Sequence, residues 1–319
     1  MPEPIFPDML ESAGAPITLA FAPEGKAYFS ERISGNLWEM DHGALRLVKN
    51  FPIVPYTGHH ETGLLGIALD PDFSQNGYIY CYYTQGTGEK DLCNRVVRIK
   101  KDGTSEEILL DGIPAGSMHN GGILAFASDK TLYIGTGVKN EEMQKSQDLD
   151  YLGGKILRIN RDGSIPTDNP FPGSPVYSFG HRNIFGLAFH PRTGKLYISD
   201  VGPEKNDEIN IIEKGGNYGW PMVTGKANNP NWVDPIVTYT PTITPTQCVF
   251  VGEDFYFGSF NEGSVHRLTL GGEKMDQVAK DEIVYRGRPF GVVGVFFGSD
   301  EKFYVTTPNK IIRFEPEVN

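Results

Sequence analysis

A histidine followed by two glycines is the first feature with chemical potential. In SMHNGGILAF, His119 precedes Asn120, Gly121 and Gly122 at the start of an apolar stretch. Paired glycines let a ligand or another backbone approach closely. A histidine has a pKa near neutrality, as a general base requires. The segment therefore predicts a base where a strand begins, and a purely structural histidine is the alternative.

Two further segments also place polar residues ahead of an apolar strand. In SFGHRNIFGLAFHP, Arg182 offers a planar cation suited to a carboxylate or a quinone oxygen, and Asn183 adds donors and an acceptor. In HHETGLLGIALDPDF, the polar residues are His59, His60 and Glu61. Both segments fit ligand binding. The alternatives are an ion pair between Arg182 and a loop carboxylate, and a solvated loop at His59 to Glu61.

An acidic loop, SDVGPEKNDEINIIEKGGNYGWP, has the composition of a calcium site. Calcium prefers a shell of carboxylate and carbonyl oxygens. Asp207 and Glu208 are the candidate carboxylates, and Gly202 and Pro203 are the candidate carbonyls. The DxDxDG spacing of an EF-hand is absent. A charged hairpin loop in an acidic protein remains the alternative.

These segments belong to a repeat that must position them. Six times the chain shows an apolar strand, a polar turn and a second strand with a tyrosine, and the tyrosines lie 48 to 64 residues apart: Tyr28, Tyr80, Tyr133, Tyr197, Tyr256 and Tyr304. Another strand-like piece follows each hairpin. Radial stacking buries both faces of such small sheets. The repeat predicts an all-β protein, a six-bladed β-propeller of four-stranded antiparallel blades, with residues 1–319 forming one domain.

Net charge and hydropathy limit the classes of partner that this chain can bind. A formal net charge of -11 opposes binding to a nucleic acid backbone, and no apolar run approaches the ~20 residues of a membrane span. The first residues lack the basic and apolar regions of a secretory signal, so the signal is either absent or trimmed. Of the three cysteines, Cys81 and Cys93 flank a turn and form a disulfide if the hairpin register suits, whereas two unbridged residues are the alternative.

Together these segments resemble the soluble pyrroloquinoline quinone (PQQ) dependent aldose sugar dehydrogenases, also called the glucose/sorbosone dehydrogenase family. The resemblance runs from about Pro16 to Phe314, and it is carried by ETGLLGIALDPDF, HNGG, GGKILRINRDGSIPTDNPF, FGHRN and VGPEKNDEINIIEKGGNYGWP. It implies a six-bladed propeller, in agreement with the repeat count. It also implies oxidation of aldoses at the anomeric carbon to lactones, with an external electron acceptor, and a periplasmic or extracellular location, although a cytoplasmic one stays open.

The resemblance also implies roles for individual residues. His119 matches the base that removes the anomeric hydroxyl proton, and Arg182 matches the residue that stabilises charge on the quinone oxygen. The implied cofactor contacts are Glu61, Arg182, Asn183 and Thr246. Gly202 and Pro203 match the carbonyls of a calcium ion that bridges to PQQ, and Glu208 with the Tyr218 carbonyl matches a second, structural calcium.

The chain departs from the family pattern at several positions. Glu61 stands where the family often has glutamine, and Phe260, Gly291 and Val293 stand where it has cations; Arg286 and Arg288 lie nearby. PQQ carries three carboxyl groups, so fewer cations weaken its binding. Two hypotheses follow: a PQQ- and calcium-dependent aldose dehydrogenase, or a non-enzymatic calcium-binding propeller of the same family that binds a sugar or a protein.

Overall fold

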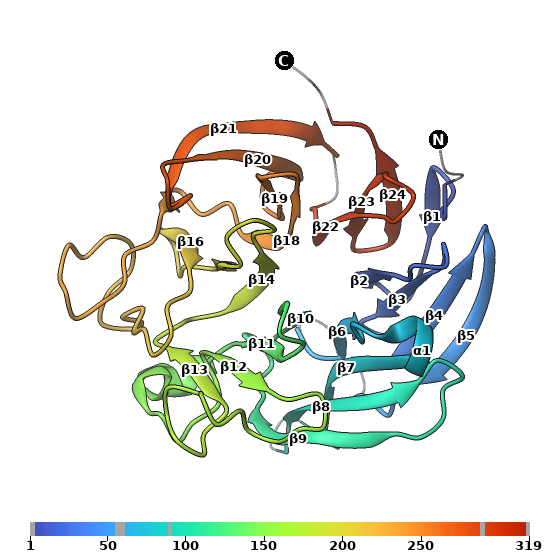
Figure 1. Ribbon diagram of the computed structural model, residues 1–319, viewed down its shortest axis with the longest axis horizontal. Coiled ribbons are helices and arrows are strands. Elements are labelled where there is room, and N and C mark those ends of the chain that lie inside the picture. The colour runs from blue at the N-terminus through green and yellow to red at the C-terminus, as the bar shows by residue number, and fades with distance from the viewer. Residues whose placement is uncertain (1–3, 55–60, 89–90, 288–290, 317–319) are drawn as a thin grey trace.

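The structure, a computed structural model, describes residues 4–54, 61–88, 91–287 and 291–316. Short strands arranged around a common centre make up the molecule (Figure 1). Within the described residues the only helical elements are α1 (Phe73–Asn76) and a 3-10 helix, η1 (Asn140–Gln147). The all-β class expected from the sequence is therefore confirmed.

Four sheets have four antiparallel strands each, taken in chain order. The first contains β2 (Pro16–Phe21), β3 (Ala27–Glu31), β4 (Asn36–Asp41) and β5 (Ala44–Asn50), and the second contains β6 (Leu64–Leu69), β7 (Tyr78–Gln85), β8 (Cys93–Lys100) and β9 (Glu107–Pro114). The third contains β10 (Gly121–Phe126), β11 (Leu132–Thr136), β12 (Lys155–Ile159) and β13 (Val176–Phe179). The fourth contains β14 (Ile184–Phe189), β15 (Leu196–Asp200), β16 (Asp207–Ile211) and β17 (Val237–Tyr239).

The remaining strands form one eight-stranded sheet with two antiparallel halves. One half contains β18 (Pro245–Val251), β19 (Asp254–Ser259), β20 (Ser264–Gly271) and β21 (Gln277–Arg286). The other contains β22 (Gly294–Phe297), β23 (Phe303–Thr307), β24 (Lys310–Phe314) and the N-terminal strand β1 (Met9–Glu11). A single parallel pair, Gln247 with Gly294, joins the halves. Because β1 pairs with β24, the two ends of the chain meet in one sheet.

The first strands of these units form an inner ring. Strands β2, β6, β10, β14, β18 and β22 contact one another in that order, and β22 contacts β2. Figure 1 shows the sheets radiating from this centre. Several four-stranded antiparallel sheets in this arrangement are consistent with a propeller.

The repeated tyrosines occupy equivalent positions. Each lies on the second strand opposite a first-strand residue, for example Tyr28 opposite Ala20, Tyr80 opposite Ala68 and Tyr133 opposite Ala125. All six are at most 6% exposed. Buried hydroxyls need partners, and the Tyr80 hydroxyl donates to Asp70 Oδ2 at 3.0 Å. The Tyr80 ring also lies 4.9 Å from the Phe126 ring of the third sheet, so it contributes to the packing between neighbouring sheets.

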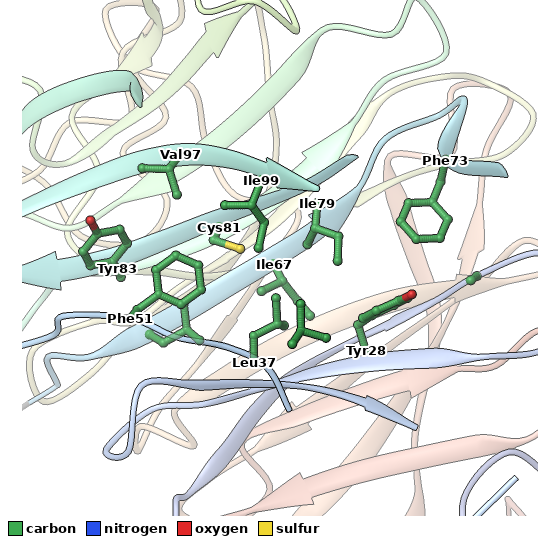
Figure 2. Packing of buried hydrophobic residues seen from close by; sticks show 13 residues of the cluster. Tyr28, Leu37, Phe51, Ile67, Phe73, Ile79, Cys81, Tyr83, Val97 and Ile99 are labelled. Atoms are coloured by element: carbon green, nitrogen blue, oxygen red, sulfur yellow. The ribbon is translucent and has the colours of Figure 1, made fainter. Parts of the chain in front are cut away.

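Apolar clusters between adjacent sheets supply the core. Figure 2 shows the cluster between the first two sheets, in which Tyr28 and Leu37 face Ile67, Ile79 and other residues of β6, β7 and β8. Such burial contributes roughly 25 cal/mol per Å² of apolar area. Packing on both faces holds each sheet in place, so the inner strand ends have fixed positions relative to one another.

The register does not suit a Cys81–Cys93 disulfide, and the alternative of two unbridged cysteines is confirmed. In the β7–β8 pair, Cys81 lies opposite Val97 and Cys93 lies opposite Gln85, so the hairpin register separates the two sulfurs. Cys81 is buried in the cluster of Figure 2. Cys81, Cys93 and Cys248 are all free thiols.

No helix in the described part of the chain is long and apolar enough to cross a bilayer.

The inner strands are irregular near their starts. Register shifts occur within β2, β6, β10, β14 and β18, early in each strand. Because a bulge redirects side chains, these positions are where polar residues can turn from the sheets toward the centre.

Candidate functional site

A cavity of about 650 Å³ lies at the inner ends of the sheets. This is within the usual range for small-molecule sites, about 300–1,000 Å³. The structure brings these sequence-predicted residues together in its wall: Glu61, His119, Arg182, Asn183, Gly202, Pro203 and Thr246. Glu208 and Tyr218 line a smaller adjacent cavity together with Gly202. Asp207 lines neither of these two cavities.

His119 is held in an uncommon backbone conformation. It has φ 61°, lies just before β10 and is only 4% exposed. Its Nδ1 is 3.1 Å from the Val138 carbonyl oxygen. A carbonyl only accepts hydrogen bonds, so this contact assigns the proton to Nδ1 and leaves Nε2 as the basic nitrogen. The tautomer is thus suited to proton abstraction at Nε2.

Burial and the positive charge of Arg182 lower the pKa of His119 to about 4. The imidazole is therefore neutral at neutral pH, as a base must be. We expect proton NMR of the protein without cofactor to show His119 titrating near pH 4. We also expect the pKa to rise toward its ordinary value in an Arg182→Met variant, because the neighbouring cation is removed. Titration near pH 6.5 in the unmodified protein contradicts this assignment.

Glu61 organises the residues around His119. Its Oε2 accepts hydrogen bonds from the His119 backbone N–H at 2.7 Å and from Asn183 Nδ2 at 3.2 Å. Asn183 Oδ1 in turn accepts from Gly121 N–H at 3.1 Å. Burial raises the pKa of Glu61. The carboxyl group thus links the second, third and fourth sheets; His59 and His60, which precede it, lie outside the described residues.

Arg182 is fixed at its backbone and partly free at its guanidinium. Asp200 Oδ1 accepts from Asn183 N–H at 2.8 Å and Asp200 Oδ2 from Arg182 N–H at 3.1 Å. Arg182 Nη1 donates to Val201 O at 2.8 Å, and the guanidinium carbon lies 5.6 Å from the Trp220 ring centre. Its buried Nε has no hydrogen-bond partner among the described residues. The site therefore offers a desolvated cation with an unused donor.

A buried lysine supports this arrangement. Lys155 is 0% exposed, and its Nζ donates to the carbonyls of Lys145, Ser146 and Gly153. Ser146 Oγ donates to Trp220 O at 2.5 Å, which ties the loop to the ring beneath Arg182. Burial lowers the pKa of Lys155 to about 7. Sequence reasoning gave Lys155 no role, because a lysine in a strand is normally read as exposed.

Arg32 is a second guanidinium in the cavity wall, and sequence reasoning also missed it. It follows β3, and its Nη1 donates to Thr62 O at 3.4 Å. Its charge opposes the rise in the Glu61 pKa. One sequence signal could have identified Arg32: it directly follows the strand that carries Tyr28, at the point where the chain returns to the centre of the molecule. Arg32 and Arg182 together put two cations at the cavity.

The positions expected to carry cations form an uncharged wall. Phe260 and Val293 line the cavity, and Gly291 lies against the Phe260 ring. Arg286, which was considered as a substitute, is exposed at the end of the outer strand β21 and is absent from the described cavity lining. Arg288 lies outside the described residues.

Glu208 lies where a cation would be favourable. Its Oε1 accepts from Gly225 N–H at 2.6 Å and its Oε2 accepts from Asn210 Nδ2 at 3.0 Å. Burial and the nearby charge of Asp200 raise the pKa of Glu208 to about 7. Asn210 Oδ1 is buried without a partner among the described residues. The unpartnered Asn210 Oδ1, together with the carboxylates of Glu208 and Asp200, fits the oxygen shell that calcium prefers.

Among the described residues, the Asp207 carboxylate, unlike that of Glu208, accepts hydrogen bonds only from backbone N–H groups of nearby loops. Its Oδ1 accepts from Gly202 N–H at 2.7 Å, and its Oδ2 accepts from Ile243 and Thr244 N–H, both at 2.7 Å. These bonds hold the Gly202–Pro203 turn and the loop before β18. Within the ranges described, no three His, Cys, Asp or Glu side chains gather as a metal cluster. Calcium binding here would therefore depend on backbone carbonyls as well as carboxylates.

Comparison with known proteins points to one family. The family model for glucose / sorbosone dehydrogenase matches residues 13–313. Quinoprotein glucose dehydrogenase B of Acinetobacter calcoaceticus is 35% identical over 250 residues, covering 68% of this chain and 52% of that protein. This chain thus spans about half the length of that relative.

Aldose sugar dehydrogenase YliI of Escherichia coli is 29% identical over 328 residues, covering 92% of this chain and 86% of that protein. The PQQ-bound form of aldose sugar dehydrogenase from Streptomyces coelicolor superposes with a TM-score of 0.84 at 30% identity, covering 99% of this chain and 100% of that one. Because the family match extends over nearly the whole sequence, the chain belongs to the glucose/sorbosone dehydrogenase family.

Proposed function

We propose that this protein is a PQQ- and calcium-dependent dehydrogenase that oxidises aldose sugars at the anomeric carbon to lactones. The observation that carries the proposal is His119 in its basic tautomer within the same cavity as the desolvated guanidinium of Arg182. A base and a fixed cation are the two groups needed when a proton and a hydride leave a sugar. The PQQ-bound relative from Streptomyces supports the choice of cofactor.

The residues present fit PQQ, an anionic tricarboxylic quinone. Arg182 has an unused donor at Nε, and Arg32 adds a second positive charge. Asn183 and Thr246 add polar groups to the lining of the same cavity. Charged hydrogen bonds contribute about 1.5–3 kcal/mol each, so two guanidiniums offset part of the loss of cations at Phe260, Gly291 and Val293.

Each residue has a defined task in the proposed reaction. His119 Nε2 accepts the proton of the anomeric hydroxyl, and Nδ1–H stays on the Val138 carbonyl, which fixes the ring. Glu61 accepts hydrogen bonds from the His119 backbone and from Asn183 and so holds both in position. Arg182 offers its guanidinium to a developing negative charge. When bound, PQQ supplies the carbonyl carbon that accepts the hydride, and an external acceptor then removes the electrons.

We propose two calcium ions. The carbonyls of Gly202 and Pro203 would hold one beside the cofactor, where a cation acts as a Lewis acid. Glu208 and the Tyr218 carbonyl would hold the other, with Asp207 keeping the loop in shape. The eight-stranded sheet counts as two blades in this proposal, which makes residues 1–319 a single six-bladed propeller. A periplasmic or extracellular location stays a prediction.

The activity is tested by reconstitution. The purified protein is mixed with PQQ and calcium, and dye reduction is followed with glucose, galactose and xylose. We expect reduction with at least one aldose, saturating in PQQ. No dye reduction at saturating PQQ and calcium with any of these sugars contradicts the proposed activity.

The proposed structural calcium predicts a stability difference. In calcium buffer, Glu208→Ala is expected to lower the melting temperature more than His119→Ala, because only the first removes a calcium ligand. A ligand at a hundred times its Kd stabilises by about 2.7 kcal/mol, or roughly 5 °C here. Differential scanning calorimetry with calcium and with chelator measures this. A matched Glu208→Gln variant should lose the calcium-dependent increase, and equal melting temperatures for the two alanine variants contradict the prediction.

A further inference from the structure

The charge of the central cavity does not match the charge of the proposed cofactor. In the described part of the chain, the charged or titratable side chains of its lining are Arg32, Glu61, His119 and Arg182. An ionised Glu61 cancels one of the two guanidiniums, and His119 is neutral near neutral pH. PQQ brings several carboxyl groups of its own. An ionised carboxylate in this wall therefore opposes the binding of the cofactor.

The hydrogen bonds of Glu61 are compatible with a protonated carboxyl group. Its Oε2 accepts from the His119 backbone N–H at 2.7 Å and from Asn183 Nδ2 at 3.2 Å. A proton on Oε1 would break neither of these bonds. The protonated side chain has one accepting oxygen and one donating group at its end, which is the pattern of the glutamine often found at this position in the family.

The charged and titratable groups that face Glu61 come from three places in the fold. Arg32 follows β3, His119 precedes β10 and Arg182 precedes β14. Burial raises the pKa of Glu61, and the positive charges of Arg182 and Arg32 oppose this rise. A bound anion offsets the guanidiniums, so it removes the influence that keeps Glu61 ionised.

His119 is the other group in the wall that could bind a proton. Its Nδ1 already carries one, because it contacts the Val138 carbonyl oxygen at 3.1 Å. A second proton on Nε2 would create a buried cation beside Arg182, which repels it. Glu61, in contrast, loses a charge when it binds a proton, and burial favours that change. The carboxyl group is therefore the better acceptor, and His119 keeps Nε2 free for the reaction.

We propose that Glu61 takes up one proton from solvent when PQQ enters the cavity, and that its protonated carboxyl group then acts as a neutral donor and acceptor in the wall. Proton uptake of this kind depends on the proposed PQQ binding and makes cofactor loading depend on pH. Because a proton binds together with PQQ, the Kd of PQQ rises with pH, by up to about tenfold per pH unit. At lower pH, where Glu61 is already protonated in the free protein, this dependence ends.

Isothermal titration calorimetry measures the proton uptake directly. PQQ is titrated into the calcium-saturated protein at several pH values between about 5 and 8, in two buffers with different ionisation enthalpies. The difference in heat gives the number of protons bound per PQQ. We expect the uptake to approach about one proton in the unmodified protein and to be nearly absent in Glu61→Gln. The Kd of Glu61→Gln should also vary little with pH, and His119→Asn is the control that should keep the uptake.

Each outcome decides between this inference and the proposed activity. Proton uptake lost in His119→Asn and kept in Glu61→Gln assigns the proton to His119 and overturns the inference. Uptake unchanged in both variants assigns it to another group, such as His59 or His60, and also overturns it. Uptake that depends on Glu61 in a protein that oxidises no aldose leaves the inference standing while the activity fails, whereas dye reduction without uptake has the opposite meaning. If neither the unmodified protein nor Glu61→Gln binds PQQ at any of these pH values, both proposals fail.

Discussion

Replacing His119 by asparagine is expected to reduce kcat of the PQQ-loaded enzyme by about 10²–10⁴-fold, the usual contribution of a positioned general base. His119 has φ 61°, a conformation that asparagine tolerates better than most residues. The asparagine amide can also donate to Val138 O, which His119 Nδ1 contacts at 3.1 Å. The variant therefore removes the basic nitrogen and keeps the local fold. Stopped-flow reduction of the bound cofactor by glucose measures the step directly.

The control for this prediction is cofactor binding. PQQ affinity, measured by fluorescence titration, should stay near that of the unmodified protein, because the residues proposed to bind PQQ are retained. Turnover within tenfold of the unmodified enzyme would show that another group removes the proton. In that case the role of His119 would be structural, the alternative left open by its sequence.

Replacing Arg182 by methionine is expected to have the second largest effect. It removes the charge, the donors at Nε and Nη1 and the guanidinium carbon that lies 5.6 Å from the Trp220 ring centre, and it keeps an apolar stem of similar length. Loss of one preorganised electrostatic donor costs about 10²–10³ in kcat. Loss of a charged hydrogen bond costs about 1.5–3 kcal/mol of binding, or roughly 10-fold to more than 100-fold in the Kd of PQQ. Both quantities are measured by PQQ titration and by steady-state dye reduction.

Arg182→Lys is the matched variant for Arg182→Met. Lysine keeps the positive charge, but it lacks the planar set of donors that bonds Val201 O and still presents Nε. Its PQQ affinity should therefore lie between those of the unmodified protein and Arg182→Met. If Arg182→Met binds PQQ as tightly as the unmodified protein, the guanidinium is not a cofactor contact.

The architecture was accessible from the sequence because the repeat is regular. Tyr28, Tyr80 and Tyr133 recur at equivalent places, and each lies opposite an alanine on the preceding strand. The same regularity placed His119 and Arg182 at the starts of first strands, so it also placed them near the centre. Local motifs therefore predicted much of the cavity wall.

What the sequence could not predict depends on long-range register and packing. Cys81 and Cys93 form no disulfide because the β7–β8 register does not place them opposite each other, and the spacing in the sequence does not reveal that register. Arg32 reaches the cavity from the first sheet, far in sequence from Arg182. The contact between Phe260 and Gly291 joins two separate strand ends, and only the folded chain shows that these substitutions accompany each other.

The most direct test of the central claim is a crystal structure of the protein with PQQ and calcium. We expect electron density for PQQ in the central cavity, with Arg182 Nε or Nη atoms within hydrogen-bond distance of it and His119 Nε2 facing the space left for the sugar. Density for PQQ elsewhere, or a central cavity without PQQ in crystals grown at saturating cofactor, would contradict the proposal and favour a non-enzymatic propeller of the same family.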